Sequence, residues 1–532
     1  MSARTSFDAF RARLRSALGC AAEPAWLVVF ALSIAFRLPS LVNAAGTNSD
    51  AAVVGLQAMH LLKGEWSPFL WGSGYQTSVD AMVAAAAFVF TGPSPLVLML
   101  TTLGGHVVLT LLAYATLRRR FPAWTAAALC LPLVFTPDPV HTYVLYPPRQ
   151  ASLTIAFVAL FLVDGAPKAK RPLLSFAAGG AVASLAVYAD PYALLFLPIV
   201  AALGFLALFD DGAANNRRAS LRKLGALAGG AALGIVPYQL LIHSEKASRG
   251  QTSLKLEVWR HNLELLWNDC LPWLLSTKVY AAQHMSDYAP VPTSGPYHGF
   301  QIVSALLLTA GVLSAFPLAF VVRIPWTVRR LGLVGALMVP AAIGGFLLSP
   351  MVMDHFSSRY LASILLLAPF ALAPITHLLG GRRFLAAMAP YLVSAAVSGW
   401  LSYAPFGLTR HPSLDVDQKL GAALRERGIH YAFAHYWASY RLTFEFREDP
   451  IVVPTPLAED RYPPYQAAFE REPVVAYIHD AYRSRGGPEQ FELELRRGEW
   501  PFEPTFDRFE VGTFTVFILR RRTVERLAHR EE

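Results

Sequence analysis

The chain has little charge and almost no cysteine. Charged residues make up 16% of its 532 residues, whereas hydrophobic residues make up 54%, and mean hydropathy is +0.38. Soluble domains carry about 25% charged residues, so this composition indicates a protein whose solvent is the lipid bilayer. Cys20, Cys130 and Cys270 lie before the first apolar run, inside a run and in a long loop. This spacing predicts neither a disulfide nor a cysteine metal site.

Signals for nucleotides, nucleic acids and secretion are also missing. The region after residue 404 has no Gly-rich phosphate loop, no His/Cys metal spacing and no obvious internal repeat. Its formal charge is +9, but the basic residues sit in short clusters between apolar runs, as in membrane topology and not as in nucleic-acid binding. Arg37 and Pro39 interrupt the first apolar run, and no small-residue cleavage site follows it. We therefore expect a retained first span and not a signal peptide.

Long apolar runs dominate the first three quarters of the chain. A bilayer core of about 30 Å requires roughly 20 apolar residues as helix. Eleven stretches meet this description: 25–42, 96–117, 122–137, 142–163, 172–189, 191–209, 224–242, 301–322, 331–349, 360–379 and 384–404. Residues 78–91 are apolar but short, which favours an interfacial or re-entrant segment. The sequence predicts a polytopic α-helical membrane protein with about eleven transmembrane helices.

Loop charge fixes the expected orientation. With 78–91 outside the count, one side carries nineteen Lys and Arg residues in six clusters, within 4–15, 118–120, 168–171, 217–223, 323–330 and 382–383. The short connections on the other side hold only Lys63, Arg149 and Arg359. The positive-inside rule then places the N-terminus in the cytoplasm and everything after residue 404 outside.

Two regions follow from this topology. Residues 1–404 are expected to form the transmembrane domain, with large outer segments at 43–95, 138–149, 243–300 and 350–359. Residues 405–532 alternate helix-like and strand-like pieces, which predicts a small extracytoplasmic α/β domain. In the first outer segment, Asn48-Ser-Asp50 opens a helical stretch that Gly64 closes, and its apolar side is expected to lie on the membrane surface.

Acidic residues near a bilayer are costly and indicate function. Asp50, Asp80, Asp138 and Asp190 all lie in outer segments or at span ends. Taken alone, Asp50 is better explained as a helix N-cap than as a catalytic base. Asp138, between two prolines, is equally well explained as a turn residue and as a catalytic residue. Asp190 precedes Pro191, so a turn role is favoured there.

The few outer cations are candidate phosphate ligands. Arg359 and Arg149 lie at outer span ends, where a guanidinium can bind phosphate through two hydrogen bonds; the alternative is snorkelling toward lipid headgroups. Lys63 and His355 are weaker candidates of the same kind. Aromatic residues in the first outer segment are candidates for lining a substrate site, or are ordinary interfacial aromatics. These substrate-lining candidates are Trp71 and Tyr75, with Gln76 and Asp80 following them.

Several motifs resemble those of the GT-C superfamily of membrane glycosyltransferases, including protein O-mannosyltransferases, aminoarabinose transferases and RgtA/B/C/D-like bacterial enzymes. The matching pieces are Asn48-Ser-Asp50 through Gly64, Trp71-Gly-Ser-Gly-Tyr-Gln-Thr-Ser-Val-Asp80, Arg118–Arg120, Asp138, Arg359-Tyr360 and the run Tyr436–Phe444. Two departures are visible: Asp50 is followed by Ala51, where many relatives carry an Asp-Glu pair, and Gln76-Thr-Ser78 replaces a proline-containing motif.

The resemblance implies an inverting glycosyltransferase that uses a polyprenyl-phosphate-linked sugar. Its acceptor is expected to be a glycolipid, an envelope polysaccharide or a protein on the outer face of a membrane, with the bacterial inner membrane the expected location. By position, Asp50 corresponds to the catalytic base and Asp138 to a second-loop acid. No cofactor is required, and a divalent metal such as Mg²⁺ or Mn²⁺ stays an open alternative. Other readings are a transporter or flippase of lipid-linked sugars, and a non-catalytic envelope assembly protein.

Overall fold

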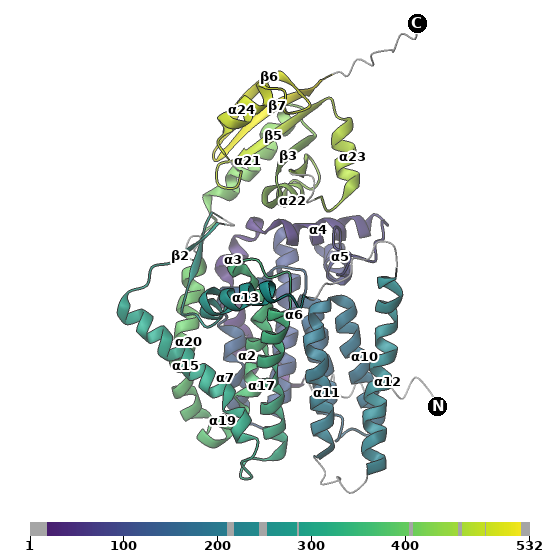
Figure 1. The fold of residues 1–532 in the computed structure, drawn as a ribbon, viewed down its shortest axis with the longest axis vertical. Helices are drawn as coiled ribbons and strands as arrows, with labels where there is room; N and C mark the ends of the chain where they lie inside the picture. Colours follow the sequence, from purple (N-terminus) through teal and green to yellow (C-terminus); the bar gives the residue numbers. More distant parts are fainter. Residues whose placement is uncertain are drawn as a thin grey trace.

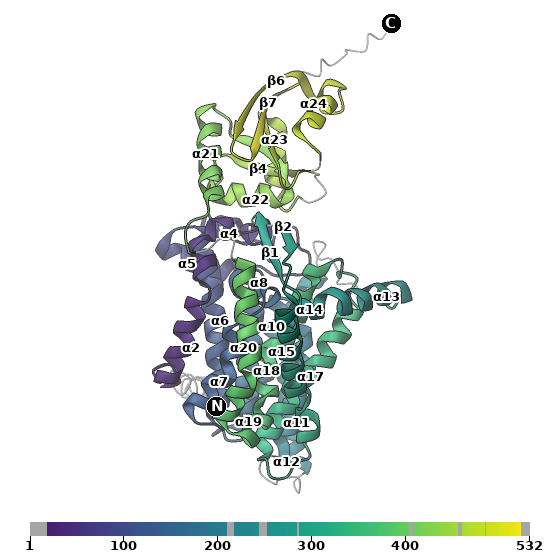
Figure 2. The same ribbon diagram turned by 90° about the vertical axis from the view of Figure 1, so that its left-hand side faces the viewer.

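The computed structural model describes residues 19–209, 217–243, 253–284, 287–403, 408–455, 460–484 and 486–522. A bundle of long helices forms most of the molecule, and a smaller domain with a β-sheet sits on one end of it (Figures 1 and 2). This arrangement confirms the predicted fold class. The predicted boundary at 404/405 falls within 404–407, and the predicted inner cluster within 4–15 falls near the N-terminus; both lie outside the described residues.

Eight of the eleven predicted spans fall on helical segments that are long and apolar enough to cross a membrane. Short helices η2 (Pro191–Leu195) and η6 (His355–Leu361) extend two of them at one end. The main helices are α6 (Pro95–Arg118), α10 (Pro172–Ala189), α11 (Phe196–Leu206), α12 (Arg217–Ile242), α15 (Gly295–Leu313), α17 (Trp326–Leu347), α18 (Ala362–Ala371) with α19 (Ala373–Leu379), and α20 (Gly381–Tyr403).

The other three predicted spans fall on shorter helices. These are α2 (Pro24–Ala35), α7 (Ala123–Val134) and α9 (Gln150–Asp164). Twelve residues of helix extend only about 18 Å. If α7 and the next helix are taken together as one bent span, the described residues provide nine spans by length and composition. The predicted count of eleven therefore includes helices that are shorter than a full bilayer crossing.

The predicted span 142–163 begins too early. Residues 138–145 form a separate helix, α8 (Asp138–Leu145), at 93° to α7. The chain then turns through Pro147 and Pro148, and α9 begins only at Gln150. Proline has no amide hydrogen and disfavours helical backbone in the residue before it, so this pair separates two helices that hydrophobicity alone had joined.

The first outer segment contains two helices, α4 (Ser49–Leu62) and α5 (Val79–Thr91). The Asn48 side chain caps α4 by accepting from the Ala51 amide at 2.8 Å, and Gly64 follows with φ +89°. The prediction that α4 lies on the membrane surface is wrong. Its residues from Ala51 to His60 are buried, and α4 lies across the end of the bundle beneath the C-terminal domain (Figure 1). The apolar face that suggested a membrane surface is covered by protein.

At the opposite end of the bundle, three arginines converge on one carboxylate. Asp164 accepts from Arg119 at 2.9 Å, Arg120 at 2.5 Å and Arg330 at 3.0 Å. The arginines belong to two clusters that the charge pattern placed on the cytoplasmic side. Their meeting at one end of the bundle agrees with the prediction that the two clusters lie on the same side.

Shorter elements complete the bundle and its outer segments. They are α3 (Leu38–Val42), α13 (Leu256–Leu265), α14 (Leu271–Leu274), α16 (Ala315–Leu318) and the hairpin β1 (Tyr280–His284) with β2 (Asp287–Pro290). The domain contains α21 (Pro412–Glu426), β3 (Tyr431–His435), α22 (Tyr436–Glu445), β4 (Ile451–Thr455), α23 (Pro463–Arg471), β5 (Val474–Asp480), α24 (Pro488–Arg496), β6 (Phe502–Val511) and β7 (Phe514–Arg521).

The C-terminal sheet has five strands in the order β4-β3-β5-β7-β6. β3 pairs in parallel with both β4 and β5, while β7 pairs antiparallel with β5 and β6. From β3 the chain passes through α22 to β4 on one side, and then through α23 to β5 on the other side. β3 is therefore a point where the winding of the sheet reverses, and its carboxyl end opens between two neighbours.

The C-terminal domain contacts the bundle mainly through α22, which packs on α4. A Cβ atom at Gly55 of α4 would lie 2.5 Å from the ring of Phe444, so only glycine leaves room for the ring at this position. The Phe444 ring also stacks near Phe88 of α5, with ring centroids 6.3 Å apart. Both helices of the first outer segment, α4 and α5, thus pack against the C-terminal domain.

Candidate active site

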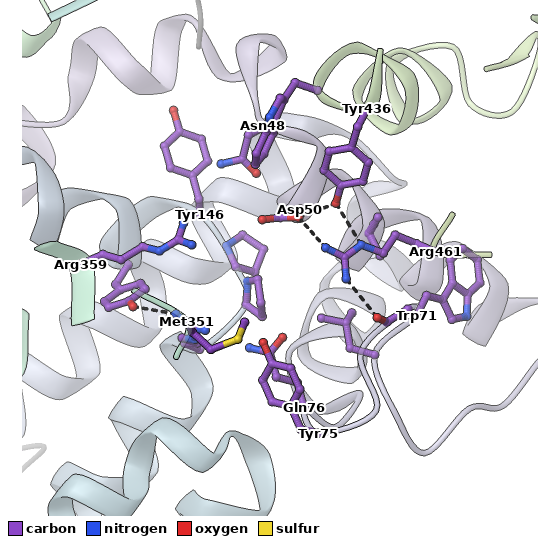
Figure 3. A pocket seen from close by; sticks show the side chains of 18 of the residues that line it. Asn48, Asp50, Trp71, Tyr75, Gln76, Tyr146, Met351, Arg359, Tyr436 and Arg461 are labelled. Atoms are coloured by element: carbon purple, nitrogen blue, oxygen red, sulfur yellow. Dashed lines mark hydrogen bonds and ion pairs between the residues drawn. The ribbon is translucent and has the colours of Figure 1, made fainter. Parts of the chain in front are cut away.

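A cavity of about 460 Å³ lies between the bundle and the C-terminal domain. Three of the four outer segments and the domain contribute to its wall, whereas no described residue of 243–300 does. Six of the predicted site residues line it: Asp50, Trp71, Tyr75, Gln76, Arg149 and Arg359. Figure 3 shows Asp50 near the middle, with Arg359 on one side and Arg461 on the other.

Asp50 is presented to the cavity by the first turn of α4. The N-cap role that the sequence favoured for Asp50 taken alone belongs to Asn48 instead. Asp50 Oδ1 accepts from the Tyr436 hydroxyl at 2.5 Å and from Arg461 at 3.4 Å. Its side chain is 34% exposed. One oxygen of the carboxylate is thus held by the C-terminal domain while the group still faces the cavity.

The partners of Asp50 are site residues that the sequence did not single out. Arg461 Nε donates to the Tyr436 hydroxyl at 3.1 Å, and Arg461 Nη1 donates to the Gly72 carbonyl at 3.1 Å. Burial and the Asp50 carboxylate raise the pKa of Tyr436, so its hydroxyl stays protonated and donates. The run that begins at Tyr436 already matched the family motifs, but nothing in its spacing placed it beside Asp50.

Arg149 lies in the wall as one member of an internal network. Its Nε is 3.1 Å from Asp190, and its Nη1 donates to the Tyr143 hydroxyl at 2.7 Å. Asp190 Oδ2 also accepts from Gln76 at 2.6 Å. The side chains of Arg149 and Asp190 are 12% and 3% exposed. Much of the Arg149 charge is therefore already neutralised. Asp190, which was expected to form a turn, also pairs with Arg149 and binds Gln76.

Arg359 has a different environment. It is half-buried, and no carboxylate of the described residues lies within ion-pair distance of its guanidinium. Its Nε is buried without a hydrogen-bond partner, and the guanidinium carbon lies 5.4 Å from the centre of the Tyr360 ring. A buried unpaired donor is costly, so this arginine is prepared to bind an anion.

The aromatic candidates line the cavity through different contacts. Trp71 stacks on Tyr462 with ring centroids 3.8 Å apart, so one of its faces is occupied by the C-terminal domain. Tyr75 has no such partner ring among the described residues, and burial raises its pKa. Gln76 is fixed by Asp190 and by Ser73. These residues shape the wall.

Four predicted site residues lie outside the cavity lining. Asp138 is buried at the start of α8, and His355 stacks on Tyr280 with ring centroids 4.5 Å apart. Lys63 pairs with Glu448 at 2.5 Å on the surface, because α4 points its last turn toward the C-terminal domain. Their assignments as catalytic or phosphate-binding residues gain no support from their positions.

Asp80, the fourth of these residues, caps α9. Its carboxylate accepts from the amides of Arg149 at 3.0 Å and Ala151 at 3.1 Å. Burial raises the pKa of Asp80 to about 6, although these two amide hydrogen bonds lower it. The predicted substrate-lining residue thus holds the backbone that carries Arg149.

A divalent metal was left open by the sequence, and the described residues offer no donor set for one. No group of three or more His, Cys, Asp or Glu side chains gathers in the described part of the chain. Asp50 is occupied by a tyrosine and an arginine, and Asp138 is not in the same cavity. Mg²⁺ and Mn²⁺ prefer sites with several carboxylate oxygens, and the cavity is lined by two carboxylates, Asp50 and Asp460.

No protein-family model matches the chain, and no curated protein matches it in sequence. Its fold does match solved structures. ArnT from Cupriavidus metallidurans bound to undecaprenyl phosphate superposes with a TM-score of 0.54 at 11% identity, and the match covers 92% of this chain and 97% of that chain. The apo state of ArnT gives a TM-score of 0.51 at 10% identity with the same coverage.

An oligosaccharyltransferase from Archaeoglobus fulgidus matches with a TM-score of 0.46 at 12% identity, covering 94% of this chain and 74% of that chain. ArnT is a GT-C glycosyltransferase. The likeness to ArnT extends over the bundle and the C-terminal domain together. The chain therefore has the GT-C fold, as its motifs suggested.

Proposed function

We propose that this protein is a membrane glycosyltransferase that moves a sugar from a polyprenyl-phosphate donor to an acceptor hydroxyl. The observation that carries the proposal is the cavity in which the Asp50 carboxylate lies near the Arg359 guanidinium, which has no carboxylate partner among the described residues. A carboxylate can take a proton from an acceptor, and an arginine can hold a departing phosphate. ArnT, which shares the fold, is known with undecaprenyl phosphate bound.

The reaction follows from these two groups. Asp50 accepts the proton of the acceptor hydroxyl while the hydroxyl oxygen forms a bond to the anomeric carbon of the sugar. The bond between that carbon and the phosphate oxygen breaks, and polyprenyl phosphate leaves as an anion toward Arg359 or Arg149. Attack from the side opposite the phosphate inverts the anomeric carbon.

Only one carboxylate is needed for this chemistry. A glycosidase must protonate an alkoxide leaving group and uses a second carboxylic acid for that purpose. A phosphate leaves as a stable anion, so hydrogen bonds and positive charge suffice. This agrees with Asp138 lying outside the cavity lining.

The orientation of the cavity is part of the proposal. The described structure has several helices apolar enough to cross a membrane, and the cavity lies at the end opposite the Asp164 cluster. Because the inner loops hold most of the positive charge, we assign the cavity and the C-terminal domain to the outer face of a bacterial inner membrane.

Two other functions share the same broad architecture. A transporter or flippase of lipid-linked sugars would place its charges near the middle of the bilayer. Here the candidate charges lie at one end of the bundle, under the C-terminal domain. A non-catalytic assembly protein would have no reason to keep an exposed carboxylate facing an arginine that lacks a carboxylate partner.

The test is sugar transfer by purified protein from radiolabelled polyprenyl-phosphate sugars. We expect Asp50→Asn to lower kcat by about 10³-fold, a typical loss for a general base. We expect Arg359→Gln to raise the KM for the donor by about 10- to 100-fold, as charged hydrogen bonds contribute about 1.5–3 kcal/mol.

Asp507→Asn and Arg497→Gln are the matched controls, since both residues are exposed on the C-terminal domain. Full turnover by Asp50→Asn would refute the assignment of the base. Passage of intact lipid-linked sugar across vesicles without donor consumption would establish the transporter instead.

A further inference from the structure

The cavity has two chemically different sides. Arg149 and Arg359 come from the bundle, whereas Tyr436, Trp437, Asp460 and Arg461 come from the C-terminal domain. Asp50 lies between the two sides (Figure 3). A transferase needs places for two substrates, so the second side requires an explanation of its own.

The residues of the second side follow the carboxyl ends of two neighbouring parallel strands. Tyr436 and Trp437 come directly after β3, and Asp460 and Arg461 lie between β4 and α23. The two strands pair in register, with His435 opposite Thr455. Open α/β sheets bind ligands outside the carboxyl ends of their strands, which is the edge that these residues occupy. The C-terminal domain turns its ligand-binding edge toward the cavity.

The backbone of Trp437 is fixed in this edge. Its carbonyl accepts from Arg483 Nη1 at 3.4 Å, and Arg483 follows the carboxyl end of β5. The Trp437 side chain is 38% exposed although it lines the cavity. The ring itself packs edge-on against the Tyr436 ring, with centroids 5.1 Å apart, and part of it stays open to a ligand.

The charge on this side is already balanced. Arg461 donates to Asp50, to the Tyr436 hydroxyl and to the Gly72 carbonyl. Asp460 Oδ1 accepts from the Tyr440 hydroxyl at 2.8 Å and from the Tyr462 amide at 3.0 Å, and its Oδ2 has no hydrogen-bond partner among the described residues. An anion would meet a free carboxylate oxygen here and no free cation, so this side does not suit the phosphate of the donor.

An aromatic ring and a carboxylate oxygen in the wall of one cavity suit a carbohydrate. A sugar ring has C–H groups that pack on an indole face and hydroxyl groups that donate to a carboxylate. We propose that the C-terminal domain binds a carbohydrate acceptor between Trp437 and Asp460, with the accepting hydroxyl directed at Asp50. The assignment of this site as the acceptor side rests on the proposed transferase function; carbohydrate binding itself does not.

Photolabelling tests the binding directly. The purified full-length protein is exposed to a panel of diazirine-bearing methyl glycosides and disaccharides, and labelled peptides are mapped by mass spectrometry. We expect label on the peptides that contain Trp437 or Asp460. Trp437→Ala and Asp460→Asn should each reduce this label at least about 10-fold, because each removes a principal contact, whereas Trp437→Phe should keep most of it.

Trp66→Ala is the matched control, because Trp66 is 61% exposed and does not line the cavity. Binding of polyprenyl phosphate should be unchanged in Trp437→Ala, which shows that the variant is folded. Label confined to other surfaces, label that survives both substitutions, label by peptide probes alone, or no label at all would each overturn the proposal. Labelling requires no sugar transfer. A protein that binds these probes but transfers no sugar would therefore refute the transferase function and not carbohydrate binding.

Discussion

Two arginines of the cavity show how neighbours decide what a residue does. Arg149 and Arg359 looked alike in the sequence, as lone cations at outer span ends. Arg149 pairs with the buried Asp190, whereas Arg359 keeps a buried Nε without a partner. We therefore expect the first arginine to contribute mainly to structure, and the second mainly to anion binding.

Because Arg149 neutralises a buried carboxylate, its substitution should lower the stability of the protein. Arg149→Gln should lower the stability of the purified protein by about 3 kcal/mol, because it leaves a buried carboxylate unpaired. The double variant Arg149→Gln with Asp190→Asn should recover at least half of the loss. Thermal unfolding in detergent measures both. Asp190→Asn alone completes the cycle, and a loss in the double variant equal to the sum of the two single losses would mean that the pair contributes no coupling energy.

At the scale of elements, α4 joins the cavity to the C-terminal domain. Its first turn carries Asp50, and its last turn carries His60, which contacts Glu65 at 2.7 Å and Glu448 at 2.6 Å. Burial opposes protonation of His60, but the two carboxylates outweigh it and raise its pKa. Hydrogen bonds from His60, Lys63 and Tyr465 outweigh burial in turn and lower the pKa of Glu448 to about 2.

These shifts predict a pH window for the docking of the domain. The raised pKa of His60 gives stability that is complete below about pH 6.5 and is lost as the pH rises through the folded-state value. The lowered pKa of Glu448 gives stability that is complete above about pH 4.5 and is lost as the pH falls toward 2. We therefore expect the domain to resist proteolysis best between about pH 4.5 and 6.5.

His60→Gln should flatten the upper limb of this profile. It should also lower stability by about 2 kcal/mol, the scale of a charged hydrogen bond. An unchanged loss of protection between pH 6 and 8 in this variant would exclude His60 as the group responsible.

The contact between α4 and α22 is equally specific in shape. Gly55→Val would drive methyl groups into the Phe444 ring, because a Cβ atom added at Gly55 would already lie 2.5 Å from that ring. We expect a loss of about 1–3 kcal/mol, as for overpacking in a core, together with lower transferase activity. Gly229→Ala in α12 is the control, since no atom lies within 4 Å of its added Cβ, and it should be neutral or slightly stabilising.

For the whole molecule, the proposed topology is open to a labelling test. Cysteine at the exposed Arg497 of the C-terminal domain should react with a membrane-impermeant maleimide in intact cells. Cysteine at the exposed Lys168 should react only after permeabilisation. The native cysteines Cys130 and Cys270 are buried, and the half-buried Cys20 is replaced by serine to remove its background. Reaction in intact cells at position 168 and not at position 497 would reverse the proposed orientation.

Hydrophobic runs and loop charge were enough to predict the helical membrane fold, because burial in lipid requires continuous apolar helices. The same runs failed at Tyr146–Arg149, where two prolines break a continuous hydrophobic stretch into α8 and α9. They also failed for α4, since an apolar helical face reads the same whether lipid or protein covers it.

The candidate site divides in the same way. The sequence by itself determined the membrane fold and the residue types near the outer face, including Asp50 and Arg359, because charges beside a bilayer are costly and stand out locally. Only the tertiary structure decided which of them share a cavity. Tyr436 and Arg461 reach Asp50 across more than 380 residues of chain. No local pattern encodes such contacts, since they depend on how α4, the sheet and the bundle pack together.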